Sequence, residues 1–219
     1  VGTQEATEEQ LVAITAQCNR YGVSADAADV QKLLQLAVMT PLKPITADND
    51  ENFSLSMLPH GECLKEIQFF YRLCYLATER INDILADEKT VVPLSHKMMR
   101  GYLTGFIDLV CRYKGRYYVI DYKTNYLGEC MGNYDRNGLV EAMRGHNYGL
   151  QYWIYTLVFH HHMKNLLPGY DYQQHFGGVM YLFVRGMTPE IPGSGIYYTK
   201  PEYSTLAELD HVIGDGDNG

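Results

Sequence analysis

The strongest structural signal in the sequence lies between residues 101 and 122. Two runs rich in β-branched and aromatic residues are separated there only by Lys114 and Gly115. Such runs around a two-residue turn with a glycine predict a β-hairpin. If Lys114 and Gly115 form the turn, the numbers of directly opposed residues sum to 229. This register places Asp108 opposite Asp121, on the same face of the sheet.

Two aspartates that face each other across a hairpin repel, so folding alone does not explain the pair. Directly opposed side chains on one face have Cβ atoms about 4.5–5.5 Å apart. Three arrangements would tolerate the two carboxylates: they share a proton, they point into open water, or they bind a divalent cation.

The neighbours of the two aspartates favour the cation. A hairpin that is apolar on both faces is a central one, in which two unpartnered carboxylates would cost several kcal/mol. The expected neighbours on the face of the aspartates are Phe106, Val110 and Val119, and those on the other face are Ile107, Leu109 and Ile120.

Lys123 follows Asp121 by two residues and therefore projects from the same face. An ammonium at this place can orient an attacking water or neutralise charge on a scissile phosphate. The structural alternative is that Lys123 only neutralises the aspartates.

The rest of the chain predicts an α/β fold, with a mixed central sheet flanked by helices. Alternating or continuous apolar runs predict further strands at residues 64–73 and 176–185. Apolar residues at helical spacing predict helices at 8–20, 25–39, 76–86 and 144–165. The order of the strands does not follow from the sequence.

The predicted elements suggest three parts. An N-terminal helical segment and linker covers residues 1–62, the core covers 63–200, and an acidic tail covers 201–219. The tail is expected to fray from Glu208, because it is acidic and contains glycine.

Composition limits the classes of protein. The chain has 219 residues, of which 46% are hydrophobic. Its net charge of −8 has the wrong sign for a protein that binds nucleic acid over its whole surface. No apolar run has the roughly 18 residues of a membrane span and no leader precedes the chain, so we expect a cytoplasmic protein without disulfides. Val1 in place of Met indicates a piece of a longer polypeptide.

Three segments together resemble a known family. GFIDLVCRYKGRYYVIDYKTNYLGE (105–129), HNYGLQYWIYTLVFHHHM (146–163) and YDYQQHFGGVMYLFVRG (170–186) are similar, in order and spacing, to the nuclease domain of the RecB family. These are the helicase–nuclease subunits of bacterial exodeoxyribonuclease V, in the PD-(D/E)xK nuclease superfamily, whose core is restriction-endonuclease-like. The likeness covers at least residues 100–200.

The resemblance implies a Mg²⁺-dependent deoxyribonuclease of double-strand break repair and recombination, with Ca²⁺ or Mn²⁺ as other occupants of its metal site. Asp108, Asp121 and the carbonyl of Tyr122 correspond to metal ligands, and Lys123 to the catalytic lysine. Glu66, in KEIQFF, occupies the place of the upstream acidic residue. Implied partners are a single DNA strand from an unwound duplex, RecC-like and RecD-like subunits, and a RecA-like recombinase.

Gln151 and Tyr155 resemble the Q-x-x-x-Y motif of the family, which lies beside the DNA strand. Four residues apart, they share one helix face, where boundary packing is the structural alternative. The chain departs from the family in one respect: no segment resembling HxxFE, which carries a metal-ligating histidine, precedes Glu66. His60 lies in a proline–glycine loop that does not match. We expect the missing ligand upstream of residue 1, and a weak or empty metal site without it.

Two rivals remain. One is a catalytically inactive nuclease-like module that guides DNA or docks subunits; the other is a metal-free glycoside hydrolase with a carboxylate pair. His160, His161 and His162 are not a metal cluster, because successive helical residues point about 100° apart, and a solvated helix face is expected there.

Overall fold

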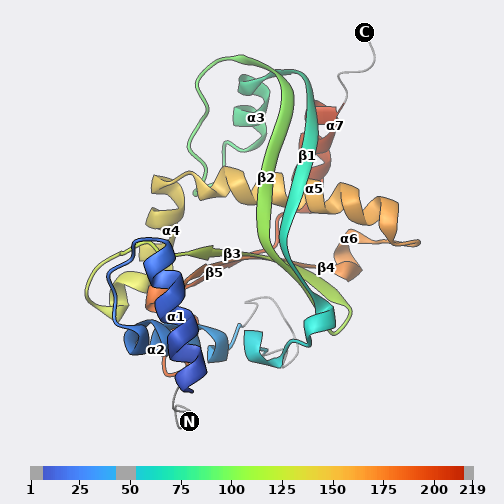
Figure 1. Cartoon of the computed structure of the whole chain (residues 1–219). Coiled ribbons are helices and arrows are strands. Elements are labelled where there is room, and N and C mark those ends of the chain that lie inside the picture. The colour runs from blue at the N-terminus through green and yellow to red at the C-terminus, as the bar shows by residue number, and fades with distance from the viewer. Residues whose placement is uncertain (1–6, 43–52, 215–219) are drawn as a thin grey trace.

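The protein is built on one five-stranded mixed sheet (Figure 1). The computed structural model describes residues 7–42 and 53–214. The strands are β1 (Cys63–Ala77), β2 (Met98–Tyr113), β3 (Arg116–Lys123), β4 (Phe176–Phe183) and β5 (Ile196–Thr199), and they lie side by side in that order. β3 and β4 are parallel and every other neighbouring pair is antiparallel. The predicted α/β class with a mixed sheet is confirmed.

The hairpin of β2 and β3 has the register that the sequence predicts. Leu109 is opposite Ile120 and Val110 is opposite Val119. The turn residues have positive φ, 46° at Lys114 and 80° at Gly115, as a two-residue hairpin turn of type I′ requires. The paired ladder ends at Leu109 and Ile120, so the two aspartates come directly after it.

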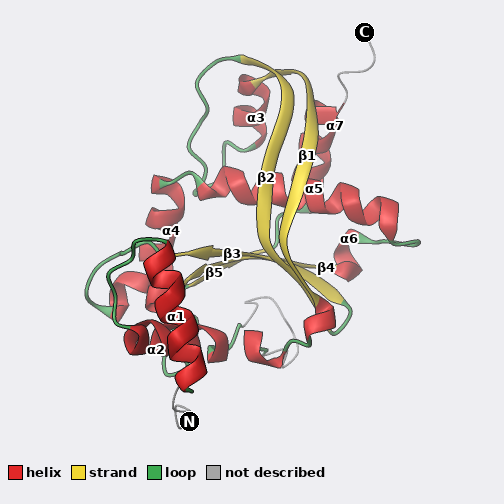
Figure 2. Ribbon diagram, in the orientation of Figure 1, coloured by secondary structure: helices red, strands yellow, loops and turns green. Residues whose placement is uncertain are grey.

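Helices and N-terminal residues cover both faces of the sheet at β3. α5 (Tyr148–Leu166) crosses one face, where Trp153 packs in the same core as Val119 (Figures 1 and 2). On the other face, Ile120 packs with Phe53 and with Ala37 of α2 (Ala27–Met39). The prediction that β3 is central and covered twice is therefore confirmed.

The N-terminal part consists of α1 (Glu8–Arg20), whose first turn is capped by Thr7, and α2. Leu42 forms an isolated bridge with Phe53, and two short 3₁₀ helices, η1 (Leu55–Met57) and η2 (His60–Glu62), lead into β1. Residues 43–52 of the predicted linker lie outside the described residues. The three-part division of the chain stays a prediction.

Several predicted boundaries are wrong. β1 runs to Ala77, so the helix expected at 76–86 is only α3 (Thr78–Ile84). The helix expected at 144–165 begins only at Tyr148, as α5; residues 144 and 145 end another helix, α4 (Arg136–Gly145), and Asn147 in the left-handed conformation (φ 52°) separates the two. The strand expected to reach residue 185 ends at Phe183, where a 3₁₀ turn, η4 (Val184–Gly186), begins.

The C-terminal segment does not fray where the sequence predicted. α7 (Tyr203–Gly214) buries Leu206, Leu209 and Ile213 against the main core, which holds it in place. The sequence also missed β5, α4 and the single turn α6 (Tyr172–His175). Within residues 7–42 and 53–214, no helix combines the length and apolarity needed to span a membrane.

The alternation of side chains along β2 breaks at Asp108. Ile107 packs under α5, whereas it was expected on the opposite face, and the ring of Phe106 is 54% exposed rather than buried beside the aspartates. The β1–β2 pairs on either side would place Glu66 opposite Asp108, but these two residues are not paired. Glu66 has a φ of 52°. The chain turns at this point, so residues before and after Asp108 face different sides.

His160 is buried, contrary to the expected solvated helix face. It is 4% exposed and its ring contacts those of Tyr170, Tyr172 and Tyr203. Burial lowers the pKa of His160 to about 4, so the ring is neutral at pH 7. His162 is exposed.

Candidate active site

Asp121 is the most buried acidic residue of the site. It lies at the carboxyl end of β3, is 3% exposed, and is paired with Tyr181 of β4. Its Oδ2 lies 2.6 Å from Lys123 Nζ, and among the described residues no hydrogen-bond donor of good geometry satisfies this oxygen. Burial raises the pKa of Asp121; Lys123 opposes the shift and the charge of Asp108 adds to it.

Asp108 links the two strands just beyond their paired ladder. Its Oδ2 accepts a hydrogen bond of 2.9 Å from the backbone N–H of Tyr122. In an extended strand the N–H and C=O of a residue point to the same side, so the Tyr122 carbonyl faces the same opening between β2 and β3. The Tyr122 side chain is 39% exposed. Asp108 therefore lies beside the backbone of Tyr122, and it is close enough to Asp121 for its charge to raise the pKa of that carboxyl.

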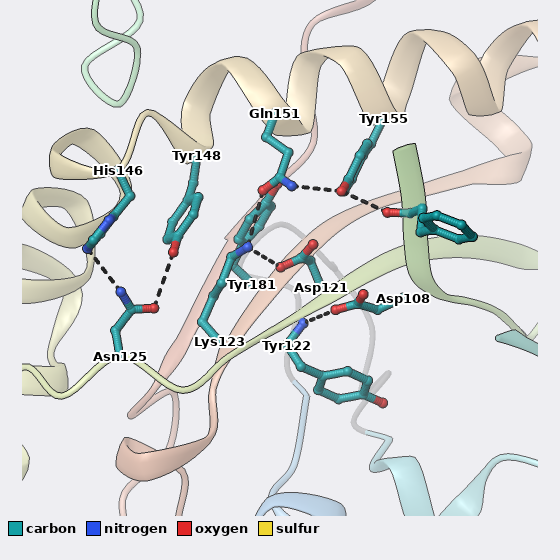
Figure 3. A network of polar contacts seen from close by, with 11 residues as sticks. Asp108, Asp121, Tyr122, Lys123, Asn125, His146, Tyr148, Gln151, Tyr155 and Tyr181 are labelled. Atoms are coloured by element: carbon teal, nitrogen blue, oxygen red, sulfur yellow. Dashed lines mark hydrogen bonds and ion pairs between the residues drawn. The ribbon is translucent and has the colours of Figure 1, made fainter. Parts of the chain in front are cut away.

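Lys123 is held on several sides. Besides Asp121, its Nζ donates to Gln151 Oε1 at 3.2 Å and lies 3.9 Å from the ring centroid of Tyr148 and 5.2 Å from that of Tyr181. An ammonium over aromatic faces is stabilised by the ring quadrupoles. The ammonium is thus fixed beside the carboxylate of Asp121 (Figure 3).

Gln151 and Tyr155 of α5 contact the site through a chain of hydrogen bonds. Gln151 Oε1 also accepts from the Tyr181 hydroxyl at 3.0 Å, while its Nε2 donates to Tyr155 Oη at 2.7 Å. Tyr155 in turn donates to the carbonyl of Phe106 at 2.8 Å. These hydrogen bonds fix Lys123, β4 and β2 relative to α5, which is more than packing at a helix boundary.

The sequence missed four residues of this network. Tyr148 and Tyr181 flank Lys123, and Asn125 joins Tyr148 to His146: the Tyr148 hydroxyl donates to Asn125 Oδ1 at 3.3 Å, and Asn125 Nδ2 donates to His146 Nε2 at 2.9 Å. Strand alternation could have found Tyr181, because it lies opposite Asp121 in the parallel pair. The other three depend on the break between α4 and α5, which the sequence did not predict.

Glu66 does not join the two aspartates. It lies on the neighbouring strand but is exposed. In the described part of the chain, no three acidic, histidine or cysteine side chains lie close enough together to hold one metal ion. The oxygen ligands offered by the site are two carboxylates and a backbone carbonyl.

Comparison with known proteins identifies the family of the chain. The family model of the PD-(D/E)XK nuclease superfamily matches residues 26–212. The chain belongs to this superfamily. It is 48% identical over 170 residues to the RecBCD enzyme subunit RecB of Escherichia coli and 37% identical over 192 residues to RecB of Haemophilus influenzae. RecB of Mycolicibacterium smegmatis is 29% identical over 242 residues.

These matches cover 75%, 84% and 96% of the chain but only 14%, 15% and 22% of the three relatives. The chain thus corresponds to a small part of each of them, and the likeness is consistent with a RecB nuclease domain.

Proposed function

We propose that the chain hydrolyses phosphodiester bonds of DNA in a Mg²⁺-dependent reaction, as the nuclease part of a RecB-type helicase–nuclease. The observation that carries the proposal is the arrangement just beyond the end of the β2–β3 ladder. Asp108 and Asp121 follow the last pair of the ladder, and Lys123 contacts Asp121 at 2.6 Å.

The residues of this site fit a hard divalent cation. Asp121 Oδ2 is buried and its one close donor among the described residues, Lys123 Nζ at 2.6 Å, makes no hydrogen bond of good geometry; burial raises the pKa of Asp121, and the negative charge of Asp108 adds to the rise. A buried anion in this state needs a cation. Mg²⁺ prefers oxygen ligands and typically binds through one or two carboxylates together with waters and substrate phosphate, which matches the donors at this place.

Asp108, Asp121 and the Tyr122 carbonyl would hold the cation. When bound, it would polarise a phosphate oxygen and lower the pKa of a coordinated water. Lys123 places its ammonium beside Asp121, where it can orient the attacking water or offset charge on the phosphate. Gln151 keeps Lys123 in this position through its 3.2 Å hydrogen bond.

The substrate and partners of the proposal follow the relatives. RecB of Escherichia coli is named as a subunit of the RecBCD enzyme, so we propose a DNA strand separated by a helicase as the substrate, and RecC-like and RecD-like subunits and a RecA-like recombinase as partners in the cytoplasm. Glu66 stays a candidate for an upstream acidic role, for which its carboxylate would have to turn toward the aspartates.

A second candidate is the inactive nuclease-like module, favoured by one observation: no third acidic side chain joins Asp108 and Asp121 among the described residues. Cleavage of labelled single-stranded DNA separates the two. We expect cleavage with Mg²⁺, its loss in EDTA, and its loss in Asp121→Asn and Lys123→Ala. Absence of cleavage at saturating Mg²⁺ or Mn²⁺, even in a longer polypeptide that extends upstream of residue 1, would favour the inactive module. Hydrolysis of glycosides in EDTA would favour the carboxylate-pair hydrolase.

A further inference from the structure

The β1–β2 ribbon extends beyond the rest of the sheet and has one uncovered face. α5 and α7 lie behind it in the view of Figure 1, and no helix of the described residues crosses its near side. Large apolar side chains nevertheless lie on the ribbon with high exposure: Phe70 67%, Tyr102 71% and Phe106 54%. We call these three residues the aromatic strip.

The aromatic strip occupies a single face. Phe70 is opposite Thr104, Tyr102 is opposite Arg72, and Phe106 is opposite Gln68. Directly opposed residues share a face, as do residues two apart on one strand, so the three rings alternate between the strands. Successive positions on one strand face lie about 7 Å apart. The strip therefore presents a row of three rings to the surface.

Two cations accompany the rings. Arg72 lies on this face directly opposite Tyr102, and Arg100 is two residues before Tyr102 on the same strand; both are exposed. No acidic residue lies in β1 from residue 67 to 73 or in β2 from residue 98 to 107. In a chain of net charge −8, this ribbon is locally basic.

The aromatic strip is continuous with the candidate active site. Phe106 precedes Asp108 by two residues, and its carbonyl accepts the 2.8 Å hydrogen bond from Tyr155. Phe70 and Tyr102 lie progressively farther along the ribbon from Asp108. A ligand that follows the three rings toward Phe106 therefore arrives beside Asp108, two residues farther along β2.

We propose that the aromatic strip binds single-stranded DNA by base stacking and leads it to Asp108 and Asp121. The inference deepens the proposed function and rests on it for the identity of the ligand. Bases of a single strand expose their faces to aromatic side chains, and arginines attract the phosphates; in a duplex the base faces are already stacked. The strip thus selects separated strands.

Binding in EDTA tests the proposal without cleavage. We would titrate the chain into fluorescein-labelled oligo(dT) of about 15 nucleotides and follow fluorescence anisotropy. Stacking contributes roughly 1–3 kcal/mol per base, so Phe70→Ala and Tyr102→Ala should each raise Kd about 5- to 150-fold. Tyr21→Ala is the matched control, because Tyr21 is also 71% exposed but lies just after α1. A blunt duplex of the same length should bind more weakly than the single strand.

The outcomes are separable from those of the nuclease assay. Wild-type Kd in both strip variants, or equal affinity for duplex and single strand, overturns the stacking proposal even if DNA is cleaved, and leaves the strip to a protein partner. A raised Kd in Phe70→Ala and Tyr102→Ala, with the wild-type Kd in Tyr21→Ala, supports the stacking proposal even if no cleavage occurs. If both proposals hold, Tyr102→Ala raises KM for the oligonucleotide in Mg²⁺ and leaves kcat unchanged. Unchanged thermal unfolding of the variants shows that they fold.

Discussion

Replacing Lys123 by Met should destabilise the metal-free protein strongly, because it leaves the carboxylate of Asp121 buried without its cation. The side chains of Lys123 and Asp121 are only 13% and 4% exposed, and their charged atoms are 2.6 Å apart. Removing one partner of such a pair costs about 3–5 kcal/mol. Met keeps much of the aliphatic stem, so the loss reports the charge more than the packing.

The destabilisation should depend on pH. Burial already raises the pKa of Asp121 above its usual 3.8, and loss of the ammonium raises it further. The folded state then binds a proton more tightly than the unfolded state, so stability falls as pH rises from 3.8 through the folded-state pKa. The difference between Lys123→Met and wild type should therefore be larger at pH 8 than at pH 5.

Urea unfolding in EDTA measures the effect, with the single, buried tryptophan, Trp153, as the fluorescence probe. The double variant Asp121→Asn/Lys123→Met removes both charges and should recover about 2–4 kcal/mol of the loss. Lys65→Met, an exposed lysine of β1, is the control. Saturating Mg²⁺ should stabilise Lys123→Met more than wild type, because a bound cation replaces the missing ammonium.

Two results would refute this reasoning. A loss below about 1 kcal/mol in Lys123→Met would mean that Asp121 does not depend on the ammonium. Additive effects in the double variant would mean that the two side chains are not energetically coupled.

Three further predictions follow from the same structure. Gln151→Leu should lower the rate of DNA cleavage about 10- to 100-fold, because it releases Lys123 and the Tyr181 hydroxyl; a rate equal to wild type contradicts the positioning role. Asp108→Asn should abolish Mg²⁺-dependent cleavage and weaken Mg²⁺ binding measured by calorimetry, and unchanged binding would remove it from the ligand set. Burial lowers the pKa of His160 from 6.5 to about 4, so between pH 6.5 and pH 4 only the unfolded state gains a proton at this histidine, and the free energy of unfolding should fall by about 3 kcal/mol. In urea unfolding, His160→Phe should lose this dependence of stability on pH, whereas the exposed His162→Gln should keep it.

The hairpin could be predicted because its information is local. Lys114 and Gly115 both adopt positive φ, as their turn requires, and the turn sets the register that places Asp108 and Asp121 just beyond the last pair of the β2–β3 ladder. The apolar residues on both faces of the hairpin also predicted a central strand, and Val119 and Ile120 are fully buried on opposite faces of β3.

The features that the sequence did not reveal depend on tertiary contacts. Asn147 separates α4 from α5, yet a single asparagine in a helical pattern does not by itself mark the end of a helix, so the break depends on tertiary contacts. Those contacts include the bonds of the Asn147 side-chain amide with the backbone of Val92, distant in sequence. The positive φ of Glu66 (52°) and the absence of a Glu66–Asp108 pair likewise mark a break in the β1–β2 ladder, next to which Phe106 is exposed and Ile107 is buried.

The burial of His160 shows the same limit. A run of three histidines has no apolar pattern, so the sequence predicted a solvated face, whereas the rings of Tyr170, Tyr172 and Tyr203 enclose the first of them. α7 was not predicted, because the acidic composition of the tail favoured a frayed end. Leu206, Leu209 and Ile213 nevertheless recur at helical spacing and are buried.

The position of a bound cation tests the central claim most directly. A crystal structure of the protein with Mn²⁺, which has a usable anomalous signal, should show a peak coordinated by carboxylate oxygens of Asp108 and Asp121 and by the Tyr122 carbonyl, and this peak should vanish in Asp121→Asn. A Mn²⁺ peak elsewhere on the chain, with Asp121 still in contact with Lys123 alone, would contradict the account.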